Sequence, residues 1–227
     1  MPYISVIMPV YNAERFLDCS VGSVLSQTFD DWELICFNDA STDRSIDILN
    51  RYASSDKRIR VIDSPVNVKQ GGGRNRGLLA AMGEYVMFLD ADDRLASHES
   101  LATCVRAIKE ENADMVLFDY ETFRNDGSDP VTVSPLGQEA AKLSGDNLRR
   151  HITMHPGPIW SAVYKRTLML ENGLVFPEGV FYEDNAVALA IQLSASLPAK
   201  INASIYGYRT DNTSVTRSRN DYRFFHR

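Results

Sequence analysis

The sequence is poor in the residues that build metal centres and disulfide frameworks. Its three cysteines, Cys19, Cys36 and Cys104, are odd in number, widely spaced and embedded in apolar or helical patterns. They have no zinc-ligand spacing, and the four histidines are also scattered. We therefore expect the cysteines to be reduced core residues of an intracellular protein, and we expect no structural zinc.

Excess positive charge and long apolar runs are also missing. The formal net charge of −6 argues against a general nucleic-acid binder, because such a protein needs a basic face. The apolar opening, residues 1–10, contains Pro9, is too short to span a bilayer and follows no basic leader segment. We expect a cytoplasmic protein, and the sequence allows peripheral contact with the inner face of the membrane.

Two common glycine-rich phosphate motifs are absent. No Gly-x-Gly follows the first predicted strand, and no Gly-Lys-Ser or Gly-Lys-Thr occurs anywhere in the chain. A dinucleotide fingerprint and a P-loop are therefore excluded. A nucleotide could still bind through other residues of an α/β sheet.

Short apolar segments alternate with helical patterns through the first half of the chain. This alternation is typical of βαβ units, so we predict an α/β fold whose mostly parallel central sheet has helices on both faces. The predicted strands are 4–8, 32–37, 59–62 and 85–89, and the predicted helices between them are 13–27, about 46–52 and 72–82. The later predictions are a helix at 97–111, a strand at 115–123, an exposed loop at 125–135, helices near 146–153, 167–172 and from 183, and a strand at 201–208.

The segment Asp90-Ala91-Asp92-Asp93 places three carboxylates at the end of the predicted strand 85–89. Clustered carboxylates repel one another unless a cation or a proton lies among them. Mg²⁺ and Mn²⁺ prefer oxygen ligands and often take one or two carboxylates, completing their shell with substrate phosphates. The alternative is that Asp92 or Asp93 caps the following helix; the clustering favours a cation site.

Other polar residues follow the first two predicted strands. Pro9, Tyr11 and Asn12 end the first strand, and Asp39 ends the second. Ligands of an open parallel sheet bind beyond the carboxyl ends of its strands, so these residues and the segment 90–92 are expected at one edge. The ring of Tyr11 could stack on a base, and the Asp39 carboxylate could accept hydrogen bonds from a base or ribose. Taken singly, Asp39 could be a turn residue and Asn12 a helix cap.

The stretch 69–77 offers three consecutive glycines followed by Arg74 and Arg76. A flexible backbone with two arginines at the start of a helix suits anionic oxygens. An ordinary solvated helix start is the alternative.

Two later features have a functional and a structural interpretation. Glu183 and Asp184 begin a predicted helix, where acidic residues are stabilised by the helix dipole, or where one could act as a general base. Trp160 is either a core residue or a platform for a sugar ring. The residues alone leave both alternatives open.

Together these motifs closely resemble the family 2 glycosyltransferases of the GT-A fold. The similarity covers the first half motif by motif and in order, and it extends more loosely to about residue 217. Glu183-Asp184 looks like the later acidic pair of that family, and Tyr208-Arg209 with 214–216 looks like its closing motif. The motifs that carry the resemblance are SVIMPVYN (5–12), NDASTD (38–43), RNRG (74–77) with GEY (83–85), and FLDADD (88–93).

The resemblance implies a GT-A-type, Rossmann-like three-layer fold and inverting transfer from a nucleotide-diphosphate sugar, with a UDP-sugar favoured, to a carbohydrate or lipid-linked acceptor. It implies Mn²⁺ or Mg²⁺ at Asp92 and a catalytic base at Asp184, with Glu183 as the other candidate. Trp160 remains the candidate acceptor-binding residue. The implied nucleotide-binding residues are Pro9, Tyr11, Asp39, Arg74, Asp90 and Ala91.

We divide the chain into a nucleotide-sugar-binding half at 1–124, an acceptor-binding half of the same domain at 125–217, and a tail at 218–227. A nucleotidyltransferase is an alternative, but it would be expected to carry a basic glycine-rich loop after the first strand. A non-catalytic nucleotide-sugar-binding domain is a second alternative. It is disfavoured because unused clustered carboxylates only cost stability.

Overall fold

The structure, a computed structural model, describes residues 1–126, 128–180 and 183–211, except for the side chain of Ala186. Its strands form one nine-stranded sheet. The strands are β1 Ile4–Val10, β2 Trp32–Asp39, β3 Ile59–Ser64, β4 Tyr85–Phe88, β5 Arg94–Leu95, β6 Met115–Phe123, β7 Val131–Val133, β8 Ala162–Lys165 and β9 Pro198–Arg209. Across the sheet they follow the order β3-β2-β1-β4-β8-β6-β9-β5, and β7 pairs with β6.

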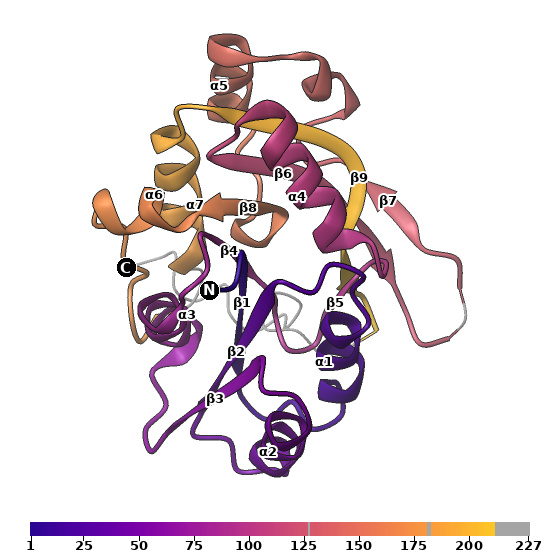
Figure 1. Ribbon diagram of the computed structural model, residues 1–227, viewed down its shortest axis with the longest axis vertical. Coiled ribbons are helices and arrows are strands. Elements are labelled where there is room, and N and C mark those ends of the chain that lie inside the picture. The colour runs from indigo at the N-terminus through magenta and orange to yellow at the C-terminus, as the bar shows by residue number, and fades with distance from the viewer. Residues whose placement is uncertain (127, 181–182, 212–227) are drawn as a thin grey trace, which may run out of the picture.

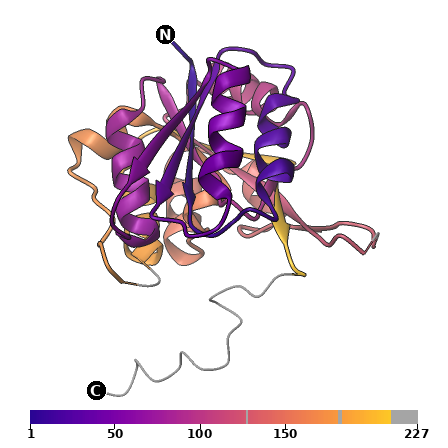
Figure 2. The same cartoon turned by 90° about the horizontal axis from the view of Figure 1, so that it is seen from below.

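Helices cover both faces of this sheet. The α-helices are α1 Leu17–Leu25, α2 Ser45–Ser55, α3 Lys69–Ala80, α4 Ser100–Glu111, α5 Gly145–Met154, α6 Arg166–Glu171 and α7 Glu183–Ser194, and two 3₁₀ turns are η1 Gln138–Lys142 and η2 Ile159–Ser161. The helix α3 packs on β1 and β2 from one face, while α1 and α2 lie on the opposite face (Figures 1 and 2). Among the described residues, no helix has both the length and the apolar character needed to cross a membrane.

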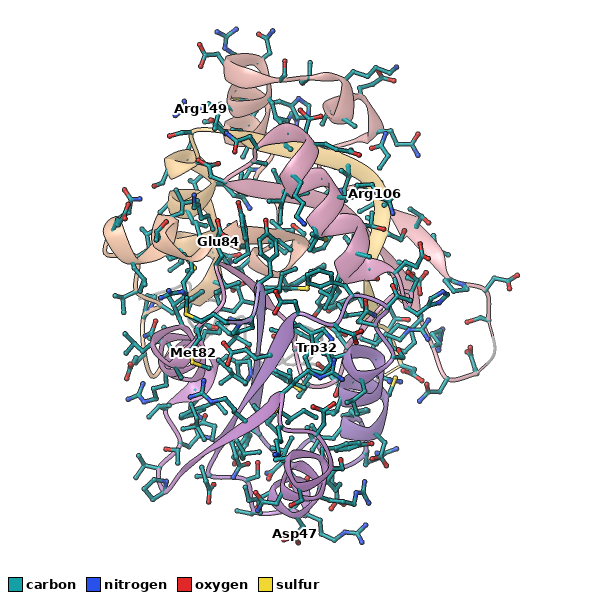
Figure 3. The ribbon with its side chains drawn as sticks, in the orientation of Figure 1. Trp32, Asp47, Met82, Glu84, Arg106 and Arg149 are labelled. Atoms are coloured by element: carbon teal, nitrogen blue, oxygen red, sulfur yellow. The ribbon has the colours of Figure 1, made fainter. Side chains whose placement is uncertain are left out.

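The four strands β3, β2, β1 and β4 are parallel, as the alternating pattern predicts. Every residue of β1, β2 and β4 is buried, because helices cover both faces of a parallel sheet. Figure 3 shows Trp32 inside the molecule at the start of β2, whereas Asp47 and Arg106 lie on the outer surfaces of α2 and α4.

The second half of the chain extends the same sheet with mixed pairing. Strand β8 lies between β4 and β6 and is antiparallel to both, while β6 and β9 are parallel. The sheet therefore crosses the boundary that we drew between 124 and 125. The predicted α/β class with a mostly parallel sheet describes the architecture, and each antiparallel pair includes one of the later strands β7, β8 or β9.

Some predicted bounds were wrong for identifiable reasons. The helix expected from 13 begins only at Leu17, because the Ala13 and Glu14 amides bond the side chains of Ser45 and Asp43. Strand β2 continues through Asp39, since its last residues pair in register with β3. The segment 125–135 is not wholly loop, because it contains β7.

Candidate functional site

The first part of the site is the edge formed by the carboxyl ends of β1 and β2. Pro9 is buried, while Tyr11, just beyond β1, is 53% exposed. Asn12 follows in the left-handed region with φ of 49°. Its side-chain oxygen accepts a hydrogen bond of 2.8 Å from the Thr42 amide, which ties the loops after β1 and β2 together.

Asp39 ends β2 with a buried carboxylate. Its Oδ1 accepts a hydrogen bond of 2.6 Å from the Val68 amide, and its carbonyl accepts one of 3.1 Å from the Asn67 side chain. These bonds hold the chain just before α3 against the end of β2. Asp39 therefore has part of the structural role that we gave as the alternative, that of a turn residue. Its second carboxylate oxygen accepts no hydrogen bond from the described residues.

The Asp90–Asp93 turn follows β4 and is held in place by hydrogen bonds with residues of β9. The Asp90 amide donates to the Tyr206 hydroxyl at 3.1 Å, and that hydroxyl donates to Asp93 Oδ2 at 2.7 Å. Asp93 Oδ1 accepts from the Arg209 amide at 2.8 Å, while Arg209 Nε donates to the Asp92 carbonyl at 2.7 Å. Asp93 thus has a structural role, and Ala91 is buried beside it.

The three carboxylates of this turn differ in their surroundings. Burial, reinforced by the charges of Asp92 and Asp90, raises the pKa of Asp93 well above its usual value. Burial also raises the pKa of Tyr206, so that its hydroxyl keeps the proton it donates to Asp93. Asp92 is half-buried. The repulsion among clustered carboxylates that the sequence predicted therefore contributes to the raised pKa of Asp93.

Arg74 connects this turn to a segment much later in the chain. Its side chain is 2% exposed, with Nη2 2.9 Å from Asp90 Oδ1 and Nη1 2.6 Å from Glu183 Oε1. Burial alone would lower the pKa of Arg74, but Asp90, Glu183 and Asp184 raise it above its usual value. The guanidinium thus joins the end of β4 to the head of α7.

Glu183 and Asp184 begin α7 but lie in different surroundings. Glu183 is 5% exposed and is bound to Arg74, whereas Asp184 is half-buried. Burial raises the pKa of Glu183; Arg74 opposes this shift, and Asp184 and Asp90 add to it. Of the two, Asp184 has the surface that a substrate hydroxyl could reach.

The glycine stretch was expected as a flexible backbone at the start of a helix, but it lies within α3, which begins at Lys69, and its glycines are buried. A Cβ at Gly71 would collide with the Pro177 carbonyl and lie 2.8 Å from Glu183 Cγ, and one at Gly73 would lie 3.1 Å from Pro9 Cβ. The glycines therefore let α3 pass closely between β1 and the segment that leads to α7.

The neighbouring residues of α3 fasten that segment. The Asn75 side chain accepts a hydrogen bond of 2.9 Å from the Phe176 amide and donates one of 2.9 Å to the Phe176 carbonyl. Arg76 forms a partly exposed ion pair of 2.7 Å with Glu178. Of the two arginines expected to meet anionic oxygens, the structure buries Arg74 among carboxylates and pairs Arg76 at the surface.

Trp160 lies in η2, and its side chain joins an aromatic cluster rather than a solvent-exposed platform. Its ring stacks on Tyr206 with centroids 4.6 Å apart and on Tyr208 with centroids 5.5 Å apart. Tyr120 meets it edge-on at 4.9 Å. Because the residue is 9% exposed, little of its surface is available to a sugar. Its acceptor role stays a prediction.

None of the sequence motifs indicated a functional role for Tyr206. The only signal was its position two residues before Tyr208, on the same face of β9. Residues 214–216 of the closing motif and the tail at 218–227 lie outside the described residues.

A divalent cation fits this site only if a bound ligand supplies further oxygen donors. Among the described residues, no group of three histidine, cysteine, aspartate or glutamate side chains is arranged to hold a metal ion. Asp90 is bound to Arg74, and Asp93 to Tyr206 and Arg209, while the family resemblance assigns the cation to the half-buried Asp92. One carboxylate completed by phosphate oxygens is a usual donor set for Mg²⁺ or Mn²⁺.

Comparison with known proteins places these motifs in a family context. The model of the family described as Glycosyl transferase family 2 matches residues 5–169. An uncharacterized glycosyltransferase of Bacillus subtilis (strain 168), EpsJ, is 32% identical over 223 residues, which make up 95% of this chain and 63% of that protein. This chain therefore spans about three fifths of the length of that relative.

Solved structures give the same fold. The crystal structure of S. aureus TarS 1–349 in complex with UDP-GlcNAc has a TM-score of 0.80 and 25% identity, covering 96% of this chain and 61% of that one. A mannosyltransferase from Pyrobaculum calidifontis in complex with GDP-Man and Mn²⁺ has a TM-score of 0.67 at 19% identity, covering 91% and 56% of the two chains, and is similar in fold alone. The predicted GT-A-type α/β fold is confirmed.

Proposed function

Since the chain belongs to glycosyl transferase family 2, we propose that it transfers a sugar from a nucleotide-diphosphate sugar to an acceptor hydroxyl. The observation that carries this proposal is the double ion pair of Arg74, 2.9 Å to Asp90 and 2.6 Å to Glu183. It brings the acidic turn after β4 to the head of α7, where Asp184 lies. The turn that we propose for donor binding and the candidate base Asp184 would then share one site.

The chemistry that this arrangement supports is a single displacement with inversion. Asp184 takes the proton of the acceptor hydroxyl while the oxygen of that hydroxyl forms a bond to the anomeric carbon. The bond from that carbon to the diphosphate oxygen breaks on the opposite face, and the nucleoside diphosphate leaves with its electron pair. One base is sufficient, so Glu183 can remain bound to Arg74 and hold the head of α7 in place.

We assign the cation to Asp92 and the diphosphate. When bound, Mn²⁺ or Mg²⁺ would neutralise the developing charge of the leaving diphosphate. The fold neighbour from Pyrobaculum calidifontis was solved with GDP-Man and Mn²⁺, which supports a metal-assisted donor site in this fold.

A UDP-sugar is the favoured donor because the TarS structure, which contains UDP-GlcNAc, has a higher TM-score than the mannosyltransferase structure with GDP-Man. The nucleoside would lie at the edge formed by Pro9, Tyr11 and Asp39, with the exposed Tyr11 ring available for stacking on the base. We propose a carbohydrate or lipid-linked acceptor, whose pocket would be near Trp160, and a role in the synthesis of a polysaccharide or glycolipid.

Calorimetric screening of nucleotide-diphosphate sugars, with and without Mn²⁺, tests the function, and Asp39→Asn tests the nucleoside site. Asparagine keeps an acceptor for the Val68 amide but loses the carboxylate charge that would accept an N–H of the base. We expect the affinity for the preferred donor to fall about tenfold or more, which is about 1.4 kcal/mol.

The matched control is Asp63→Ala, at the end of the neighbouring strand β3, where the carboxylate accepts a hydrogen bond of 2.7 Å from Asn38. This variant should bind the donor as the wild type does. Unchanged affinity in Asp39→Asn would return Asp39 to a purely structural role.

A further inference from the structure

The acidic turn is held by a tyrosine that no sequence motif indicated. The Tyr206 hydroxyl accepts a hydrogen bond from the Asp90 amide at 3.1 Å and donates one to Asp93 Oδ2 at 2.7 Å. It therefore bonds the first and the last residue of the four-residue turn. The turn is also closed on itself by a bond of 3.0 Å from the Asp93 amide to the Asp90 carbonyl.

The ring that carries this hydroxyl has little freedom. Tyr206 is fully buried, stacks on Trp160 with an interplanar angle of 23°, and is in register with Tyr120 on β6. A side chain fixed by packing on several sides can hold a loop more precisely than a loop holds itself. The position of the hydroxyl is therefore set by the β6–β9 pair and by η2.

We propose that Tyr206 is a positioning residue for donor binding, whose hydroxyl holds the Asp90–Asp93 turn so that Asp92 meets the diphosphate and its cation. This inference rests on the proposed function and identifies a residue that holds the donor-binding turn of that site in place. Because Tyr206 is fully buried, its hydroxyl would act on Asp92 through the bonds to Asp90 and Asp93.

The same tyrosine connects two parts of the site. Its hydroxyl bonds the donor turn, and its ring stacks on Trp160, the predicted acceptor-binding residue. A change at Trp160 should therefore alter donor binding as well as acceptor binding.

Tyr206→Phe removes the hydroxyl and keeps the ring, so the aromatic cluster is preserved. Tyr85→Phe is the matched control, because Tyr85 is also buried, lies at the opposite end of β4 and donates a hydrogen bond of 2.9 Å to the Ala113 carbonyl. Each variant loses one buried hydroxyl, so both should lose similar stability in thermal unfolding.

Only Tyr206→Phe should weaken Mn²⁺-dependent binding of the UDP-sugar that the wild type prefers, by about tenfold in calorimetry. Binding of that donor without Mn²⁺ should change much less. Tyr206→Phe with wild-type affinity in Mn²⁺ would overturn the proposal, and so would an equal loss in Tyr85→Phe, because the loss would then follow from stability alone.

A second readout does not depend on any ligand. Amide hydrogen exchange of Asp90, followed by NMR, should be about tenfold faster in Tyr206→Phe and unchanged in Tyr85→Phe. Unchanged exchange in both variants would overturn the proposal. If the wild type binds no sugar nucleotide, the proposed function fails, whereas this exchange measurement still decides whether Tyr206 holds the turn.

Discussion

Asp184→Asn should reduce kcat by about 10²–10⁴-fold while leaving the affinity for the donor close to that of the wild type. The substitution keeps the shape of the side chain but removes the basic oxygen that we propose takes the acceptor proton. Asp184 is the half-buried member of the acidic pair, so it is the one that an acceptor hydroxyl can approach. Release of the nucleoside diphosphate in the presence of acceptor measures turnover, and calorimetry measures donor affinity.

Two further variants make this result specific. Glu178→Gln removes a partly exposed carboxylate that pairs with Arg76, and it should leave turnover nearly unchanged. Glu183→Gln weakens the bond to Arg74 and should act mainly on stability. Near-normal turnover in Asp184→Asn, together with its loss in a stable Glu183→Gln variant, would assign the base to Glu183 instead.

Arg74→Met should destabilise the fold by about 3–5 kcal/mol, because it leaves the carboxylates of Asp90 and Glu183 without their buried partner. Glu183 is almost wholly enclosed, so water cannot readily replace the guanidinium. The free energy of unfolding, from urea titration, measures the loss. Donor affinity should also fall, since Asp90 and the head of α7 lose their common anchor.

The control lies two residues along the same helix. Arg76→Met breaks the partly exposed pair with Glu178 and should cost about 0–1 kcal/mol. Arg74→Lys keeps a charge but has no planar fork to reach two carboxylates, so it should fall between the other two variants. Equal stability of Arg74→Met and Arg76→Met would mean that the Arg74 pairs contribute nothing to the fold.

The sequence predicted the site best where the relevant contacts follow from strand direction. Parallel strands have their carboxyl ends at one edge, so the residues after β1, β2 and β4 could be brought together without knowing any side-chain contact. The strand at 115–123 and the start of α7 at Glu183 were also predicted correctly, because long apolar segments and acidic helix starts are local signals.

The parts that could not be predicted depend on contacts between distant residues. The partner of Arg74, Glu183, is 109 positions later, and nothing local distinguishes a buried guanidinium from a solvated one. The insertion of β8 between β4 and β6 is a choice of topology, and Tyr206 is 113 positions from Asp93. The need for glycine in α3 follows from the close approach of Pro9 and Pro177, which come from other parts of the chain.

Asp92→Ala is the sharpest test of whether the turn after β4 binds a sugar nucleotide together with a divalent cation. Calorimetric titration of the preferred UDP-sugar should show binding that Mn²⁺ strengthens in the wild type. In Asp92→Ala the strengthening by Mn²⁺ should be lost, because the carboxylate that we propose as the protein ligand of the cation is gone. Undiminished Mn²⁺-dependent binding by Asp92→Ala would contradict the account.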